Sequence, residues 1–294
     1  MNIRKPIVVG QFYPAEKASL QQALDELLSI EPLDETSLPA KIIAGIVPHA
    51  GWVCSGAVAG KVFRAIQSRG PVETFVLFGA VHRYGLNRSA IFSSGQWETP
   101  LGSIEIDQTL AEQILAETDL VTDNPQAHMG EHSLEVQIPF IQRLFPHARI
   151  VPIMIPSNNL ALETGQAIGR ILKTSPTPVV CIGSTDLTHY GPAYAMTSHG
   201  RGLQGIRWSK EVNDQGLIEK IIGMDARGAM KYAQENQAAC GPGALAATIA
   251  LAEELSARRV EVLEHTNSYE VLHRCYGEIG DDAVGYGAII FGSD

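Results

Sequence analysis

Three apolar runs, rich in β-branched residues, each end in a turn that contains a histidine. The runs are IIAGIVPHAGW, FVLFGAVHRYG and VVCIGSTDLTHYG, and their turns carry His49, His82 and His189. A short apolar run bounded by glycine or proline is typical of a buried strand. In an open α/β sheet the carboxyl ends of the strands line the ligand crevice. We therefore expect these histidines to converge on one metal or proton-transfer site.

The segments between these runs predict a single α/β domain over residues 1–294. A helix at 54–68 lies between apolar runs at 41–47 and 72–78, which gives one βαβ unit with parallel strands. The stretch 89–107 predicts two short strands and an antiparallel interruption. The other expected helices are 16–30, 107–117, 132–145, 159–173, 209–235 and 243–257, and the other strands 148–155, 177–183, 260–270 and 284–291. The expected fold is a mixed, mostly parallel central sheet flanked by helices.

Composition and charge exclude several classes of protein. The chain has 294 residues, 45% of them hydrophobic, and a formal charge of −10, so it can bury a large core but lacks the basic patch that nucleic acid requires. The first residues, MNIRKPIVVGQFYP, do not form a secretory signal, and no apolar stretch reaches the roughly 18 residues of a membrane span. We expect a cytoplasmic protein with neither nucleic acid nor a membrane as partner.

The three histidines occupy different local settings. Pro48 fixes the backbone before His49, and Gly51 permits a tight passage into the next helix. Asp186 lies three residues before His189 and could orient its imidazole. A single loop histidine is more often a surface or hydrogen-bonded residue than a ligand, but three at strand ends favour a functional site.

A cysteine provides a candidate fourth group. Cys240 precedes Gly-Pro-Gly and a helix of small residues, and a helix N-terminus can lower the pKa of a nearby thiol. The alternative is a small hydrophobic residue that only fills space. Cys54 and Cys181 fall in a predicted core helix and strand, where packing explains them. The cysteines contain no CxxC pair, so neither a disulfide framework nor a zinc ribbon is expected.

The segment HMGEHSLEVQIPF contains a second candidate metal motif. His128, Glu131 and His132 have the order H-x-x-E-H, the inverted form of the zincin motif. Gly130 and Pro139 favour a junction between a loop and a helix over a continuous helix that carries ligands. The zinc hypothesis therefore depends on whether these two histidines share a face.

Seven motifs, in this order along the chain, resemble the Memo family, whose prokaryotic members are labelled AmmeMemoRadiSam system protein B. They are VGQFYP, PHAGWVCSG, FGAVHRYG, GEHSLEVQIPF, GSTDLTHYG, ACGPGAL and VGYGAIIF. The resemblance covers nearly the full chain. The family is similar in fold to class III extradiol ring-cleavage dioxygenases, which implies one α/β domain. Those enzymes hold Fe(II) with two histidines and a carboxylate, while another histidine acts in acid–base steps.

The resemblance implies a role for each matching residue. It implies that His49, His82 and Cys240 are the metal ligands. It also implies that His189 is the catalytic acid–base group and that Asp186 is its catalytic neighbour. Glu131 and His132 would support the pocket. This chain departs from common family residues at Trp52, Cys54 and Pro242, and the last puts an anion-binding arginine in doubt. A cysteine as third ligand also departs from the dioxygenase pattern.

The cysteine leaves more than one chemistry open. The resemblance favours a non-haem Fe(II)-dependent oxidoreductase acting on an unknown small substrate, with a radical SAM protein as a functional partner. Thiolate is a softer donor than carboxylate, so zinc or copper would also suit the site. The alternatives are a non-catalytic adaptor that binds a metal or a peptide at a vestigial dioxygenase site, and a zinc hydrolase.

Overall fold

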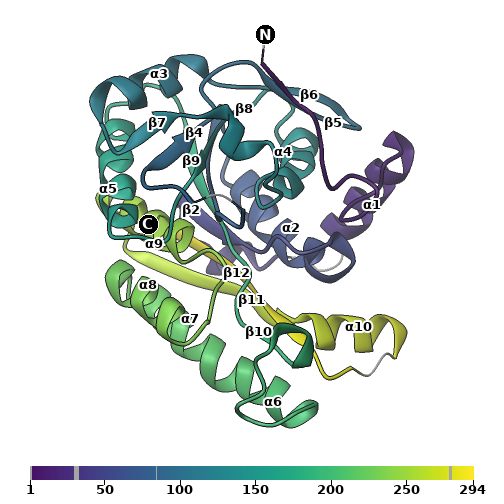
Figure 1. The fold of residues 1–294 in the computed structure, drawn as a ribbon. Helices are drawn as coiled ribbons and strands as arrows, with labels where there is room; N and C mark the ends of the chain where they lie inside the picture. Colours follow the sequence, from purple (N-terminus) through teal and green to yellow (C-terminus); the bar gives the residue numbers. More distant parts are fainter. Residues whose placement is uncertain (1, 30–32, 84, 278–279) are drawn as a thin grey trace.

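The computed structural model describes residues 2–29, 33–83, 85–277 and 280–294 (Figure 1). Nine strands of these described residues form one mixed sheet. Its central strands lie in the order β2, β9, β3, β8 and pair in parallel. They span Lys41–Val47, Val179–Ser184, Thr74–Gly79 and Arg149–Met154. The predicted α/β class and the parallel arrangement of the first βαβ unit are confirmed.

Antiparallel pairs occur at both margins of this sheet. On one side β12 (Ala283–Ser293) pairs with β2, while β11 (Arg259–Asn267) and β10 (His189–Tyr190) pair with β12. On the other side β4 (Ser89–Ile91) pairs antiparallel with β8 and in parallel with β7 (Val121–Asp123). Because β10 contains His189, the sheet itself holds the backbone of this histidine in place.

A separate small sheet contains the predicted antiparallel interruption. The stretch 89–107 contains three strands, one more than predicted, because β4 joins the large sheet before the chain leaves it. β5 (Gln96–Thr99) and β6 (Gly102–Glu105) then form an antiparallel hairpin, and β1 (Ile3–Arg4) pairs with β5. The departure passes through Gly95, whose φ of +103° is disfavoured for residues with a side chain.

Two helical layers cover the large sheet because alternate residues of its strands face opposite sides. In β3, Phe75 and Leu77 join one hydrophobic core, and Val76 and Phe78 join the other. The first core is covered by α1 (Lys17–Ser29), α2 (Trp52–Ser68) and α4 (Ile138–Leu144). The second is covered by α3 (Gln108–Glu117), α5 (Leu160–Leu172), α7 (Gln215–Ile222), α8 (Ala226–Glu235) and α9 (Pro242–Glu254).

The prediction of one continuous helix at 209–235 is wrong. The structure has α6 (Leu203–Trp208), a π-helical segment (Ser209–Asp214), α7 and α8. The chain breaks at Met224, whose φ is +52°, and Asp225 then caps α8 by accepting a hydrogen bond from the backbone N–H of Gly228. Within the described ranges, no helix has the length and apolar character that crossing a bilayer requires.

Two other predicted boundaries differ from the structure. The helix expected at 132–145 begins only at Ile138, after a 3₁₀ turn at Glu135–Gln137. The strand expected at 260–270 ends at Asn267, whose side chain accepts a hydrogen bond from Glu270 N and starts α10 (Ser268–Tyr276). In each case the hydrophobic pattern continues past the boundary, and a local turn or cap sets where the helix begins or the strand ends.

Candidate metal centre

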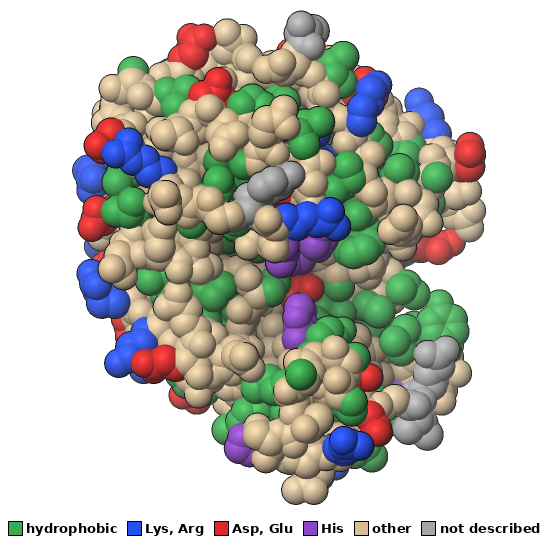
Figure 2. Space-filling model, in the orientation of Figure 1, with side chains coloured by type: hydrophobic (Ala, Val, Ile, Leu, Met, Phe, Trp, Pro, Cys, Tyr) green, Lys and Arg blue, Asp and Glu red, His purple; other side chains and the backbone are tan. Residues whose placement is uncertain are grey.

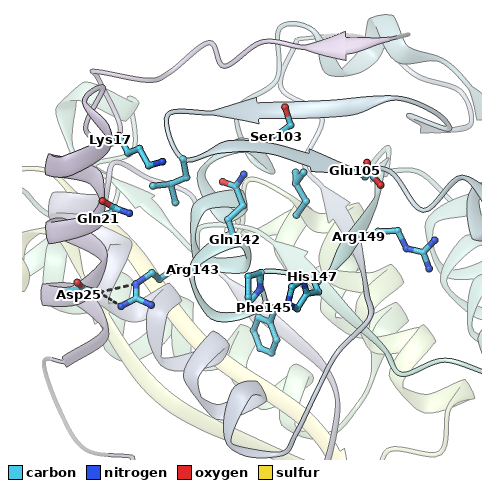
Figure 3. Close-up of a pocket in the computed structure, with 14 residues that line it drawn as sticks. Lys17, Gln21, Asp25, Ser103, Glu105, Gln142, Arg143, Phe145, His147 and Arg149 are labelled. Carbon is cyan, nitrogen blue, oxygen red and sulfur yellow. Dashed lines mark hydrogen bonds and ion pairs between the residues drawn. The ribbon is translucent and has the colours of Figure 1, made fainter.

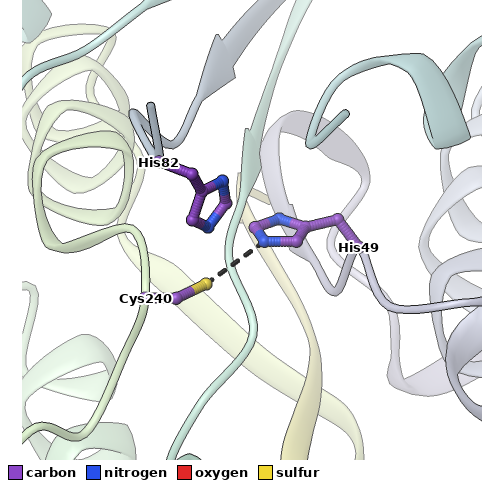
Figure 4. Close-up of side chains that lie close together, drawn as sticks. All are labelled: His49, His82 and Cys240. Carbon is purple, nitrogen blue, oxygen red and sulfur yellow. Dashed lines mark hydrogen bonds between the residues drawn. The ribbon is translucent and has the colours of Figure 1, made fainter. Parts of the chain in front are cut away.

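Three loops at the carboxyl edge of the parallel strands bring His49, His82 and Cys240 together. His49 follows β2, His82 follows β3, and Cys240 lies just before α9. His49 Nε2 is 3.2 Å from Cys240 Sγ. One ligand atom from each of the three residues lies within 4.8 Å of the others. Figure 4 shows both rings and the sulfur directed into a common space. Because parallel strands end on the same edge, residues far apart in sequence meet here.

His189 and Asp186 adjoin the same space. His189 Nε2 is 3.8 Å from Asp186 Oδ2, and ligand atoms of Asp186, His189 and Cys240 lie within 4.8 Å of one another. Asp186 also accepts a hydrogen bond from the backbone N–H of His49 at 2.7 Å. His189 has a side-chain exposure of 36%, whereas His49 is 2% exposed. His189 is therefore the more accessible of these two imidazoles.

Glu131 fixes the orientation of His82. Its carboxylate oxygens lie 2.9 and 3.1 Å from His82 Nδ1. The carboxylate also accepts hydrogen bonds from the backbone N–H groups of His82, His132 and Ser133. Burial alone would raise the pKa of Glu131. The interactions with His82 and the hydrogen bonds from these N–H groups outweigh burial and lower the pKa to about 2. Because the ionised carboxylate only accepts, Nδ1 carries a proton, and Nε2 is therefore the nitrogen that would bind a metal.

Ser184 performs the same task for His49. The Ser184 hydroxyl donates to the backbone oxygen of Ser133 at 2.7 Å, so at His49 Nδ1, 3.0 Å away, it acts as acceptor. His49 Nδ1 therefore carries the proton and its Nε2 lone pair points toward Cys240. Burial lowers the pKa of His49 to about 4. At neutral pH the ring is uncharged, the form in which imidazole binds a metal.

Cys240 differs from the expected low-pKa cysteine. Burial, reinforced by the nearby Asp186 carboxylate, raises the pKa of its thiol. The N–H groups at the start of α9 are turned to other acceptors, since Gly241 N donates to Thr185 and Gly243 N to Ser157. The helix N-terminus therefore does not stabilise a thiolate. Without a cation the sulfur remains a thiol and donates to His49 Nε2 at 3.2 Å.

The structure separates the members of the H-x-x-E-H motif. The His132 ring lies 5.4 Å from the ring of His49 and 4.9 Å from that of His82, so His132 adjoins both candidate ligands. His128 ends a 3₁₀ helix and is fully buried elsewhere, with Nε2 3.0 Å from Ala90 O. The chain turns at Gly130, so the two histidines share no helix face. The zincin hypothesis is wrong for this reason.

Sequence reasoning missed a buried charged network behind the pocket. Arg4 is fully buried and forms an ion pair with Glu135, with Nη1 2.7 Å from Oε2. Arg4 also donates to the backbone oxygens of Glu131 at 2.6 Å and His128 at 3.1 Å. Tyr13 donates to Glu135 at 2.9 Å. The network therefore holds the backbone of the residue that orients His82. Nothing in MNIRKP distinguishes Arg4 from a surface arginine.

Substituting Glu131 tests its orienting role. Glu131→Gln is expected to lower the affinity for a divalent metal about 10- to 100-fold, as is usual when a residue that orients a ligand histidine is lost. Titration with Co²⁺ measures the change. Glu105→Gln, on the exposed part of β6, is the matched control and should bind as the parent does. Equal affinity for the parent and Glu131→Gln would contradict the assignment.

The burial of His128 leads us to expect that the protein becomes less stable as the pH falls. Its Nε2–H donates to Ala90 O, and its buried Nδ1 has no hydrogen-bond partner in the described residues. Burial lowers its pKa to about 3, whereas it titrates near 6.5 in the unfolded chain. As pH falls below about 6.5 the unfolded state gains the proton first, so His128 reduces the free energy of unfolding by about 1.4 kcal/mol per pH unit.

Urea denaturation between about pH 7 and pH 4.5 checks this expectation. The parent should lose stability more steeply than His128→Gln, whose amide can still donate to Ala90 O. Parallel pH profiles for the two proteins would contradict the assignment of a neutral, buried His128.

Two cavities bear on where ligands could enter. One of about 430 Å³ adjoins the centre and is lined by Leu187, His189, Tyr194 and Cys240 among others. Another of about 1000 Å³ lies between α1, the β5–β6 hairpin and the start of β8, and contains the Asp25–Arg143 ion pair (Figure 3). Histidine side chains appear in the hollow in the middle of the face in Figure 2. The smaller cavity is the one that reaches the candidate ligands.

Comparisons with known proteins show which proteins this chain is similar to. A family model described as Memo-like protein matches residues 4–290. MEMO1 family proteins from Pyrococcus abyssi and Thermococcus onnurineus are each 36% identical over 296 residues, covering 98% of this chain and 99% of the relative. One from Pyrobaculum arsenaticum is 36% identical over 299 residues, covering 99% of both. A solved structure of an uncharacterized protein, JW3007 from Escherichia coli K12, is 8% identical with a TM-score of 0.49, covering 84% of this chain and 99% of that one.

Proposed function

The chain belongs to the Memo family, and on that premise we propose that it is a metal-dependent oxidoreductase acting on a small molecule. The observation that carries the proposal is the convergence of His49, His82 and Cys240 within 4.8 Å, with His189 beside them. Three protein ligands on one side leave coordination positions on the other, as sites that handle a substrate require.

The donor set fits a first-row transition metal. His49 and His82 would each bind through Nε2, because Ser184 and Glu131 hold a proton on the other ring nitrogen, Nδ1. Cys240 adds a sulfur ligand once its proton is lost, which metal binding promotes. We propose Fe(II), on the resemblance to iron dioxygenases; zinc and copper are the competitors that the thiolate admits. When bound, Fe(II) would supply one-electron redox chemistry.

The residues on the other side of the pocket would handle the substrate. His189 would move a proton to or from the substrate, and the Asp186 carboxylate faces its ring, with Oδ2 3.8 Å from Nε2. The His189 ring stacks on Tyr194 with centroids 5.0 Å apart. Both residues line the cavity of about 430 Å³, which is large enough for a small organic molecule.

Oxygen uptake by anaerobically reconstituted Fe(II) protein tests this function. The protein should consume O₂ when a library of small compounds contains a substrate. His189→Ala should retain the metal but slow uptake by about 100-fold or more, the usual contribution of a general acid or base. Loss of metal from His189→Ala would make it a ligand, and an unchanged rate would remove it from the reaction.

A further inference from the structure

A second cavity, of about 640 Å³, lies between α1, the loop 10–14, α2 and α10. Its walls are mostly apolar and include four aromatic residues from three separate segments: Phe12, Tyr13, Trp52 and Tyr276. Figure 2 shows hydrophobic side chains on both sides of the indentation at the right edge of that face. This size and lining are typical of small-molecule sites.

The floor of this cavity is fixed, whereas its rim is open. Tyr13 and Trp52 are 3% and 5% exposed, and their rings lie 5.5 Å apart. At the rim, Val53 and Tyr276 remain 58% and 63% exposed. Apolar side chains left open around a buried aromatic floor mark a surface that gains free energy when an apolar ligand covers it.

Charged residues on the cavity wall balance one another. Lys61 Nζ lies 3.1 Å from Glu264 Oε2, and both side chains are mostly buried, at 14% and 20% exposure. Of the other described residues that line the cavity, Glu26 and Arg274 carry one charge of each sign. An ionised ligand would lose hydration here without finding an excess of the opposite charge. The wall therefore favours an uncharged ligand.

One wall of the cavity also contacts the metal centre. The Phe12 ring lies 5.1 Å from the His132 ring, and His132 lies 5.4 Å from His49. Phe12 O accepts a hydrogen bond from Trp52 N at 2.8 Å, which fixes the loop against the start of α2. A ligand in the cavity would therefore lie one side chain away from the residues that surround the candidate ligands.

We propose that this cavity is a binding site for a neutral, planar aromatic small molecule. Flat rings would stack on the exposed ring of Tyr276 and rest on the floor formed by Tyr13 and Trp52, and Val53 would cover their edge. The proposal concerns binding in the metal-free protein and does not require the oxidoreductase function. Either proposal can therefore fail while the other stands.

Equilibrium dialysis of the metal-free, full-length protein against 2-naphthol tests the site. Binding should be saturable, and the anion 2-naphthoate should bind at least about ten-fold more weakly. Ala57→Phe fills the cavity from α2 and should weaken 2-naphthol binding at least about ten-fold. The same substitution at Ala116, exposed on α3, is the control and should leave binding unchanged.

Tyr276→Ala provides a second variant, because its exposed position makes misfolding a weak explanation for any loss. It should weaken 2-naphthol binding several-fold and leave the unfolding midpoint unchanged. The proposal is overturned if 2-naphthol does not saturate the protein, if Ala57→Phe and Tyr276→Ala bind as the parent does, or if 2-naphthoate binds equally well.

Discussion

Cys240→Ser is expected to lower the affinity for Fe(II) by more than about 100-fold, since loss of a ligand should exceed the 10- to 100-fold cost of losing a residue that only orients one. A serine hydroxyl is a harder donor and does not ionise as a thiol does. His49 and His82 would remain within reach of the metal but supply only two donors. Anaerobic titration with a competing chelator measures the affinity.

The control for this experiment is Cys275→Ser, the same substitution at an exposed cysteine on α10. It should bind Fe(II) as the parent does. Cys240→Ser should also keep the parent's stability in the metal-free state, because the thiol there makes only weak hydrogen bonds. A Cys240→Ser protein that binds Fe(II) with the parent's affinity would remove Cys240 from the ligand set.

Arg4→Met is expected to lower the free energy of unfolding by about 3–5 kcal/mol, the usual cost of leaving one partner of a buried ion pair alone. Glu135 would keep its hydrogen bonds from Tyr13, Ile7 and Val8 but lose its buried cation. The backbone oxygens of His128 and Glu131 would lose a donor as well. Urea denaturation measures the loss.

The matched control is Arg143→Met, which removes an ion pair with Asp25 at the surface. There the two side chains are 46% and 57% exposed, so the loss should be about 0–1 kcal/mol. If Arg4→Met costs no more than Arg143→Met, the network does not stabilise the fold. Because Arg4 donates to Glu131 O, the variant should also bind Fe(II) more weakly.

The sequence predicts the parallel centre of this fold well because each central strand is an apolar run that ends in a turn. The boundaries that it predicts less well coincide with local turns and caps. α4 begins at Ile138, after a 3₁₀ turn, and β11 ends at Asn267, whose side chain caps α10. The hydrophobic pattern continues through both positions.

The candidate site divides in a similar way. The positions of His49 and His82 at strand ends identify them as candidate ligands in the sequence. Cys240 is identified by the glycines that follow it. Ser184 and Arg4 have no comparable pattern, since their roles depend on which backbone oxygens the folded chain places beside them. The raised pKa of the Cys240 thiol is also a tertiary effect, because burial outweighs the helix N-terminus that the sequence displays.

Metal analysis with X-ray absorption spectroscopy, on protein purified without oxygen, tests the central claim most directly. The account predicts one iron per chain, bound by one sulfur at about 2.3 Å and two imidazole nitrogens at about 2.0–2.1 Å, distances typical of such ligands on a first-row metal. The sulfur contribution should vanish in Cys240→Ser. A protein without stoichiometric metal, or a metal with no sulfur ligand, would contradict the account.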